Sequence, residues 1–354
     1  MNEEMRRTQI TYPVTTACFS INENREIQDL EFAEWIAKEN LEFGFINMYM
    51  GSTSTLSSCC RLRSDTSSEF FNSFGAGSSK IGSLGVVTIN FPRLAIIHGK
   101  EGFKEALKHY VEMTANINQA KREVLQDVID KGCAPIYNYH FAELSKQYST
   151  TGVNGLYEAL VELGYDITTE EGQEAAIDIM KSVTEVIDKM QEKFKAPHNC
   201  EQIPGENTSI KFAKKDNLLG FQHKNKIYSN QFVPLTAEVD ILTRIYIQGK
   251  LDGHFSGGSV LHINVDERIK DYSKLVELIK LCAKQGCIYF AINYCLNKCV
   301  DEHLTVGKVD ICPVCGKEIK DRFTRVVGFL TSVKSWHKVR RELDFPNRKF
   351  YGGI

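Results

Sequence analysis

Hydrophobic and polar positions along the chain fall into blocks with two different periods, which predict helices and strands. Apolar residues recur at helical spacing in four segments, residues 28–43, 101–131, 169–195 and 272–285. Short, continuous apolar runs, typical of strands buried on both faces, occupy residues 85–90 and 287–293. Because such strands alternate with long helices, the pattern predicts an α/β fold with a largely parallel sheet.

Shorter patterns add further elements to this outline. Weaker apolar alternation predicts strands at residues 9–20, 135–140, 208–213, 259–265 and 324–330. Thr168 and Glu171 have the spacing of a capping box, which would start the helix over 169–195. Residues 51–84 show neither period and are rich in serine and glycine. We interpret them as one long functional loop, since structureless loops of this length are rarely passive connections.

Composition narrows the classes of function. The 354 residues are 42% hydrophobic and 25% charged, with a formal net charge of −2, which is ordinary for a globular protein. This charge balance argues against a general nucleic-acid-binding surface. No apolar stretch reaches the roughly 18 residues of a membrane span, and no apolar signal core follows residues 1–7. We therefore expect a cytoplasmic protein that binds neither nucleic acid nor membrane.

The cysteines predict a metal site. Eleven cysteines are many for a reducing compartment, where metal or catalytic roles are commoner than disulfides. Cys312-Pro313-Val314-Cys315-Gly316 has the spacing of a zinc knuckle, in which two thiolates share one tetrahedral ion. A second pair of ligands must come from upstream. The residues leave two choices, Cys295 with Cys299 or Cys299 with His303, and both fit the usual ligand spacing.

A glycine follows this knuckle. Gly328 lies within the segment Arg325-Val326-Val327-Gly328-Phe329-Leu330, close to the C-terminal end of the sequence. Taken alone, it is a glycine in a short strand, where glycine weakens the strand and often marks a close approach of backbones.

In this combination the sequence resembles the anaerobic ribonucleoside-triphosphate reductase family, in which a zinc knuckle directly precedes an Arg-Val-x-Gly-Tyr/Phe-Leu segment. Other motifs of that family occur in the expected order along nearly the whole chain. They are Ser58–Leu62, Gly85–Arg93, Gly155–Leu160, Pro204–Asn207, Ser256–Gly258 and His262–Asn264. Each motif is weak alone, and the ordered set carries the resemblance.

The resemblance implies a fold. It predicts the C-terminal half of a ten-stranded α/β barrel of the glycyl-radical enzyme type. Residues 1–294 would form the partial barrel and carry a cysteine loop over 51–84. Residues 295–354 would form the zinc knuckle and the C-terminal domain that bears the glycyl radical.

The resemblance also implies a reaction. A separate radical-SAM iron–sulfur activating enzyme would remove a hydrogen atom from Gly328, and the glycyl radical would oxidise a loop cysteine to a thiyl. The thiyl would abstract the 3′-hydrogen of a ribonucleoside triphosphate, the 2′-hydroxyl would leave as water, and formate would be the reductant. Only glycine suits the radical position, because a side chain would crowd the planar radical and obstruct the partner thiol.

Several residues follow as candidates for the site. Cys59 and Cys60 are the candidates for the thiyl. Adjacent residues of an extended loop point to opposite sides, and we favour Cys59. Asn90, at the end of a predicted strand, could line the site or only cap that strand end. Gly257 and Gly258 could let the backbone approach the substrate phosphates, or they form an ordinary turn.

The sequence departs from the family pattern in two ways. Residues 1–58, which precede the paired cysteines, predict one strand and one helix, too little for half a barrel. We therefore expect an open sheet edge and an N-terminal half supplied in trans, which would also provide the dimer contact; a truncated fragment is the alternative. The family also shows two Cys-x-x-Cys pairs, whereas Glu302 and His303 follow Cys299 here.

Two other functions are open at this point. One is another glycyl-radical enzyme, similar to pyruvate formate-lyase, which would share the paired cysteines and the glycine but not the knuckle. The other is an inactive fragment that acts as a zinc-ribbon binding module. That module would explain residues 295–316 but not the order of the other motifs.

Overall fold

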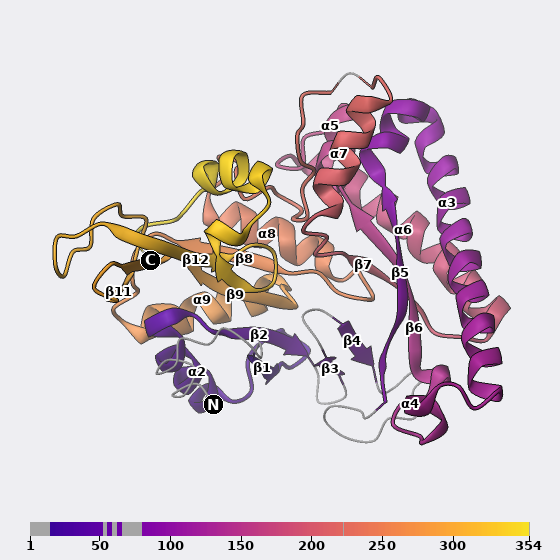
Figure 1. Ribbon diagram of the computed structural model, residues 1–354, viewed down its shortest axis with the longest axis horizontal. Helices are drawn as coiled ribbons and strands as arrows, with labels where there is room; N and C mark the ends of the chain where they lie inside the picture. The colour runs from indigo at the N-terminus through magenta and orange to yellow at the C-terminus, as the bar shows by residue number, and fades with distance from the viewer. Residues whose placement is uncertain (1–14, 52–54, 59–61, 66–79, 222, 354) are drawn as a thin grey trace.

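Figure 1 shows the computed structural model, which describes residues 15–51, 55–58, 62–65, 80–221 and 223–353. Helices and strands alternate over most of this length and pack around two large hydrophobic cores. None of the helices in this described part has the length and apolar character that crossing a membrane requires.

The first core lies on a four-stranded sheet in the order β1-β2-β9-β8. Its strands are β1 (Thr15–Ser20), β2 (Ile46–Gly51), β8 (Leu261–Val265) and β9 (Tyr289–Tyr294). β1 pairs in parallel with β2 and β8 with β9, whereas β2 and β9 run antiparallel. Two helices that contact each other, α2 (Leu30–Phe43) and α9 (Tyr272–Gln285), bury their apolar faces in this core.

The second core lies on a three-stranded parallel sheet in the order β5-β6-β7. Its strands are β5 (Gly82–Asn90), β6 (Gln147–Asn154) and β7 (His198–Gln202). The longer helices of this part are α3 (Phe91–Asp130), α5 (Leu156–Glu162), α6 (Glu170–Phe194), α7 (Thr208–Leu218) and α8 (Ile241–Asp252). The short helices α4 (Pro135–Asn138) and η1 (Leu144–Lys146) connect α3 to β6.

The two sheets meet where β7 approaches the segment before β8. Glu201 and Gly258 form a parallel bridge there, and the N–H of Gln202 donates to the carbonyl of Gly258 at 3.1 Å. The strands thus follow one another in the order β5-β6-β7-β8-β9-β2-β1. Among the described residues, β5 and β1 are the two ends of this row. The predicted α/β fold is confirmed, and a closed barrel would need further strands between these ends.

A third, antiparallel sheet is formed near the C-terminus, in the order β11-β10-β12-β13. Its strands are β10 (Leu296–Cys299), β11 (Leu304–Val306), β12 (Ile319–Arg325) and β13 (Leu330–Ser332). The chain continues through the short helices η2 (Val333–Ser335), η3 (Arg340–Asp344) and η4 (Phe345–Asn347). It then returns to the first sheet, where Tyr351 forms a parallel bridge with Val265 of β8.

The long helices and the strands predicted at 259–265 and 287–293 are confirmed, with small changes at their ends. The helix predicted at 101–131 is the second part of α3. A first part begins at Phe91, where Asn90 caps it, and the two parts meet at a kink at Gly99. Thr169, rather than Thr168, caps α6, since its Oγ1 accepts the N–H of Gly172 at 3.1 Å.

Two predicted strands are wrong, because both segments are helical. Residues 135–140 contain α4, with Pro135 in the first turn, where a missing N–H is tolerated. Residues 208–213 begin α7, whose buried Ile210 and Ala213 lie one helical turn apart. Six residues are too few to distinguish a period of 2 from one of 3.6.

The strands β6 and β7 are among those that the hydropathy pattern does not predict. The sequences of β6 and β7 are polar, yet nearly all of their residues are buried. Their polar side chains find partners inside the protein: the Thr151 hydroxyl lies 2.7 Å from that of Thr114, and Arg122 donates to the carbonyl of Gln147 at 2.5 Å. Hydropathy cannot reveal a strand whose burial depends on such partners.

The segment 51–84 is more structured than one long loop. It contains an antiparallel hairpin of β3 (Thr55–Ser58) and β4 (Leu62–Asp65), and it ends in the first residues of β5. The prediction that β5 is buried on both faces is also wrong. Val86 is 41% exposed, because β5 is the edge strand of its sheet among the described residues.

The contact between α8 and α9 gives a test of this packing. A Cβ on Gly249 would lie 1.9 Å from the carbonyl oxygen of Gln285, so Gly249→Ala must push the two helices apart. We predict a loss of about 2 kcal/mol in the free energy of unfolding, measured by urea denaturation. Gly253→Ala is the matched control, because no atom lies within 4 Å of its Cβ. Equal stability of the two variants would contradict the packing.

Candidate metal centre and glycine turn

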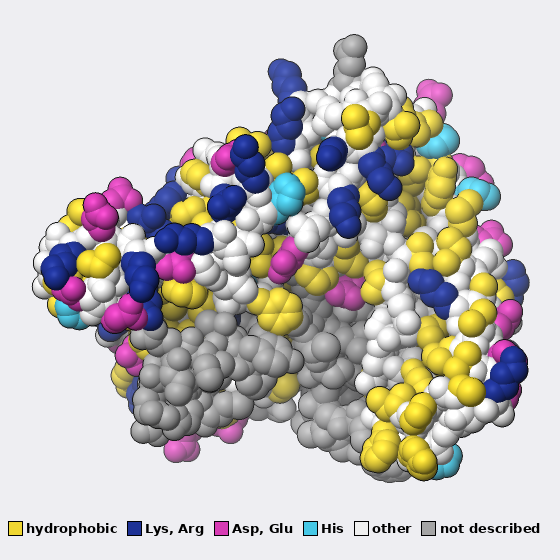
Figure 2. Space-filling model, viewed as in Figure 1, with side chains coloured by type: hydrophobic (Ala, Val, Ile, Leu, Met, Phe, Trp, Pro, Cys, Tyr) yellow, Lys and Arg dark blue, Asp and Glu magenta, His cyan; other side chains and the backbone are white. Residues whose placement is uncertain are grey.

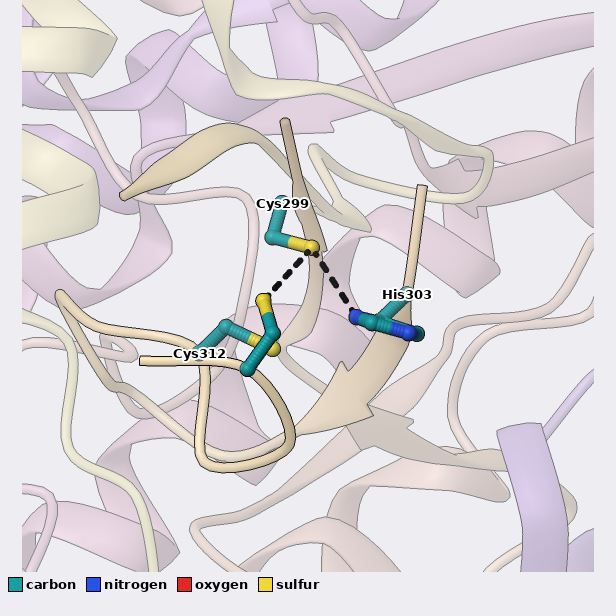
Figure 3. A group of neighbouring side chains, drawn as sticks. Cys299, His303 and Cys312 are labelled. Atoms are coloured by element: carbon teal, nitrogen blue, oxygen red, sulfur yellow. Dashed lines mark hydrogen bonds between the residues drawn. The ribbon is translucent and has the colours of Figure 1, made fainter. Parts of the chain in front are cut away.

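Three cysteines and one histidine of the C-terminal sheet converge on one point (Figure 3). Cys299 ends β10, His303 directly precedes β11, and Cys312 and Cys315 lie on the turn before β12. The ligand atoms of these four residues all lie within 4.8 Å of one another. The chain reverses between β10 and β11, and this reversal places His303 beside Cys299.

The distances fit a tetrahedral zinc ion. Cys299 Sγ lies 3.5 Å from His303 Nδ1 and 3.7 Å from Cys315 Sγ. Zinc bonds of ~2.3 Å to sulfur and ~2.0 Å to nitrogen, at tetrahedral angles, place two sulfurs about 3.8 Å apart and a sulfur and a nitrogen about 3.5 Å apart. Both distances match this geometry, so the four residues could hold such an ion, with Nδ1 as the ligand atom of His303.

The local backbone favours the thiolate form that a metal binds. Desolvation raises the pKa of the Cys312 thiol, but hydrogen bonds from the amides of Cys315 and Val314 outweigh it and bring the pKa to about 7. Gly316 adopts a left-handed conformation with φ of +71° and donates its N–H to the carbonyl of Cys312 at 2.8 Å. This turn brings Cys312 and Cys315 to the same side of the knuckle.

Cys295, the alternative fourth ligand, lies elsewhere. It is buried in a small cluster with Val326, Val327 and Trp336. It is not among the four residues whose ligand atoms lie within 4.8 Å of one another. The structure thus favours the ligand set with His303 over the ligand set with Cys295, a choice that the sequence left open.

Gly328 lies in the turn that joins β12 to β13, and not inside a strand as predicted. The N–H of Val326 donates to the carbonyl of Phe329 at 3.1 Å and closes the turn. Val326 and Val327 are buried, Gly328 is half-buried and Phe329 is 36% exposed. The glycine therefore stands at the boundary between the packed interior and the surface of the described chain.

Arg325 holds the first end of this turn. Its guanidinium donates to the carbonyl of Gly44 at 3.1 Å and to Asn47 Oδ1 at 2.7 Å. Its own N–H donates to Asn293 Oδ1 at 3.1 Å. Gly44 ends α2, Asn47 lies on β2 and Asn293 on β9, so the turn is tied to the first sheet at three places.

Arg348 holds the same end of the turn through its backbone carbonyls. It donates to the carbonyl of Arg325 at 2.6 Å and to that of Val326 at 2.9 Å. Its guanidinium carbon lies 4.7 Å from the centre of the Trp336 ring, close enough for a cation–π interaction. No local pattern marks Arg348, because its hydrogen bonds go to backbone carbonyls more than 20 residues away in the chain.

Asn90 is the cap of α3. Its Oδ1 accepts the N–H of Arg93 at 3.2 Å, and its Nδ2 donates to Asp216 at 2.8 Å. Asp216 is fully buried and also accepts hydrogen bonds from Arg93 Nε at 2.5 Å and from the Tyr228 hydroxyl at 2.7 Å. Burial and the Asp216 carboxylate raise the pKa of Tyr228, so its hydroxyl stays protonated. The capping role is observed, and a role in lining the site stays a prediction.

Gly257 and Gly258 join the two sheets. The N–H of Gly257 donates to the carbonyl of Cys200 at 2.7 Å, and that of Gly258 to the carbonyl of Phe255 at 2.9 Å. A Cβ on Gly257 would lie 2.9 Å from the Cys200 oxygen, and Gly258 has φ of +97°. Both amides have partners in the chain, which accounts for the turn and the sheet contact. A role of these glycines in phosphate binding stays a prediction.

Cys59 and Cys60 lie outside the described residues. The described residues on either side, Ser58 of β3 and Leu62 of β4, are paired with each other, and β3 contacts β1 and β2. The assignment of the thiyl to either cysteine stays a prediction.

Metal analysis tests the ligand set. We predict that the wild-type chain binds one zinc ion and that Cys295→Ser still binds it. His303→Ala should weaken zinc binding by at least about 100-fold, because loss of a direct ligand should cost more affinity than loss of an outer-shell partner. Zinc content after dialysis and competition with a chelator measure both. The free energy of unfolding should fall with the zinc, because such binding stabilises the folded state. Loss of zinc from Cys295→Ser alone would overturn the assignment.

Comparisons with known proteins agree with this architecture. A family model described as anaerobic ribonucleoside-triphosphate reductase matches residues 1–351. A solved structure of an anaerobic ribonucleotide reductase superposes with a TM-score of 0.87 at 32% identity, and covers 100% of this chain and 57% of its own. The Thermotoga maritima enzyme with glycerol in the active site gives a TM-score of 0.82 at 33% identity, covering 98% and 58% of the two chains.

A second structure of the Thermotoga maritima enzyme, in complex with dATP and CTP, also has a TM-score of 0.82, at 32% identity, with 96% and 57% of the two chains covered. The chain thus spans less than three fifths of the length of these similar proteins. No curated protein sequence matches it. The family match over nearly the whole length and the shared fold agree, and the chain belongs to the anaerobic ribonucleoside-triphosphate reductase family.

Proposed function

We propose that this chain is the C-terminal catalytic part of an anaerobic ribonucleoside-triphosphate reductase and that Gly328 stores its radical. The observation that carries the proposal is the turn at Gly328. A half-buried glycine directly follows residues 325–327, whose first two residues are held by two buried guanidinium groups, beside a hairpin shaped for zinc. Such a turn gives a backbone radical a fixed position without a side chain in its way.

The proposed reaction begins away from the substrate. A radical-SAM activating enzyme removes one hydrogen atom from the Cα of Gly328. The glycyl radical then takes the hydrogen atom of a cysteine thiol, which leaves a thiyl and restores the glycine. The thiyl abstracts the 3′-hydrogen atom of the ribonucleotide, and the 2′-hydroxyl leaves as water after taking up a proton. Formate supplies the two electrons of the reduction and leaves as carbon dioxide.

Zinc has a structural role in this proposal. The cluster of Cys299, His303, Cys312 and Cys315 ties the loop after β10 to the turn before β12. β12 pairs with β10 and runs directly into the Gly328 turn. The metal therefore stiffens the strand that presents the glycine, at a distance from the chemistry.

The substrate and the thiyl are assigned on the family resemblance. A ribonucleoside triphosphate is the proposed substrate, and the similar Thermotoga maritima structure is a complex with dATP and CTP. Cys59 is the proposed thiyl, with Cys60 as the alternative. Asn90 is a candidate for the lining of the site, since it ends β5 and its amide is held by Asp216.

The proposed enzyme is completed by an N-terminal half in trans, which also carries the dimer contact. Three features of the described chain support this. Within the described ranges the strand row has two ends, β5 and β1, and no strand closes the space between them. The similar structures extend well beyond the part that this chain covers. α3 also carries a line of exposed side chains at alternating spacings of three and four residues, Tyr110, Met113, Ile117, Ala120 and Val124.

This line is the kind of seam on which a second helix packs. Figure 2 shows hydrophobic side chains gathered on the flank that α3 and α4 occupy in Figure 1, where Ile136 and Tyr139 of the α4 region are also exposed. Because α3 follows directly on β5, a strand added beside β5 with its own helix would cover this seam.

Electron paramagnetic resonance tests the radical assignment. After anaerobic incubation with its activating enzyme, the chain should give the doublet of a glycyl radical, and Gly328→Ala should give none. Gly352→Ala is the matched control and should keep the doublet, because nothing lies within 4 Å of a Cβ added there. A doublet of full intensity from Gly328→Ala would place the radical elsewhere.

The same preparations identify the thiyl. Cys59→Ala and Cys60→Ala should both carry the doublet. With the radical installed and the N-terminal half added, only Cys59→Ala should fail to form deoxyribonucleotide. Full turnover by Cys59→Ala would move the thiyl to Cys60.

Assembly in trans has a separate test. The chain alone should show no reductase activity, and its tagged form should co-purify from its own cells with a polypeptide matching the N-terminal part of the family. Ile117→Glu should weaken this complex by about 100-fold, because it places an unpaired charge in the seam. Gln126→Glu adds the same charge on another exposed face of α3 and should leave binding unchanged. Reductase activity of the isolated chain would refute the proposal.

A further inference from the structure

Three charged residues near the C-terminus form a buried line. Arg340 Nη1 donates to Asp344 Oδ2 at 2.8 Å. Arg348 donates to both oxygens of the same carboxylate, from Nε to Oδ1 at 2.7 Å and from Nη2 to Oδ2 at 2.8 Å. The exposed fractions are 3% for Arg340, 8% for Asp344 and 4% for Arg348. The only carboxylate in this line thus holds both guanidinium groups.

The two ends of the line contact different parts of the protein. Arg348 reaches the carbonyls of Arg325 and Val326, at the start of the Gly328 turn. Arg340 Nε donates at 3.0 Å to the carbonyl of Glu206. Glu206 lies in the Pro204–Asn207 motif, which links β7 to α7 at the carboxyl end of the parallel strands. In parallel α/β sheets this end is where ligands bind.

The carboxylate is essential to the line. Burial raises the pKa of Asp344, but the charges of Arg348 and Arg340 and their hydrogen bonds outweigh it and hold the pKa below its usual value. The group is therefore ionised at neutral pH and lies between two buried cations. Removing its charge would leave those cations facing each other without a partner, which is strongly unfavourable in a protein interior.

The line has room to rearrange. A cavity of about 400 Å³ borders all three residues, and its other lining comes from α5 and the segments 224–230 and 234–236. Leu343, between the charged residues of η3, is 44% exposed. The cavity thus leaves space beside the buried line into which its side chains can move.

We propose that Asp344 is a positioning residue that couples the Gly328 turn to the Pro204–Asn207 loop through Arg348 and Arg340. The role of Gly328 in this proposal rests on the proposed function, whereas the coupling between the turn and the loop does not. When the line is closed, the turn is fixed in its site and the radical is stored. When it opens, the turn and the loop are released together, which exposes Gly328 to the activating enzyme.

Hydrogen–deuterium exchange on the full chain tests the coupling without any radical. In Asp344→Asn, the exchange rate of the backbone amides should rise by about tenfold in two segments. These are residues 326–330 of the turn and residues 209–211, which follow the Pro204–Asn207 loop. Tenfold is the scale expected for losing a charge-assisted hydrogen bond. Glu342→Gln removes an exposed carboxylate from the same short helix and should change neither segment. If Asp344→Asn does not fold, Arg340→Gln replaces it in the same exchange measurement. Arg340 has no hydrogen bond to the turn, so a rise at 326–330 in this variant reports coupling, and no rise there overturns it.

The radical gives a readout that a general loss of structure would not produce. With the activating enzyme, Asp344→Asn should form the glycyl doublet several-fold faster than wild type and also lose it several-fold faster, because a freed turn is easier to reach and less protected. A misfolded chain would form it more slowly. Wild-type rates of formation and decay in Asp344→Asn would overturn the positioning role. Absence of the doublet from the wild-type chain would instead refute the proposed function, and the exchange data would still decide the coupling.

Discussion

The position of the Gly328 turn depends on two buried guanidinium groups that bind backbone carbonyls. Arg325 donates to the carbonyls of Gly44 and Phe45, and Arg348 to those of Arg325 and Val326. A buried arginine must have its donors satisfied, and a bond to a charged group is stronger than one between neutral groups. The turn is therefore fixed by contacts that do not need a side chain on the glycine itself. Such a turn can keep one position even though its glycine has no side chain to pack.

These contacts are part of a polar network that ties the C-terminal sheet to the first sheet. Asn293 of β9 accepts from the N–H of Arg325 and from the hydroxyl of Thr324, and it donates to Asn264 of β8 at 2.7 Å. Tyr351 pairs beside Val265, and its hydroxyl donates to the carbonyl of Val239 at 2.6 Å. The C-terminal sheet is thus joined to the first sheet by polar groups in the interior, and the metal-binding hairpin extends from it. A metal at Cys299, His303, Cys312 and Cys315 would then act on the turn through β10 and β12.

Much of the outline could be predicted from the sequence, for local reasons. Long helices such as α2 and α9 have a clear apolar stripe, and β9 has a continuous apolar run. β6 and β7 could not be predicted, because their polar side chains are buried only through distant partners such as Arg122 and Thr114. The short segments at 135–140 and 208–213 were assigned to strands because a few residues do not define a period.

By itself, the sequence determined the chemistry available to this protein: a thiol-and-imidazole metal site, a glycine after it and an ordered set of family motifs. These depend on residue type and spacing, which a chain carries before it folds. Only the tertiary structure decided between His303 and Cys295, since that choice depends on which side chain the β10–β11 turn brings to Cys299. It alone placed Gly328 in a turn and revealed Arg348 and Asp344 behind it. Such contacts join residues far apart in the chain, and no local pattern records them.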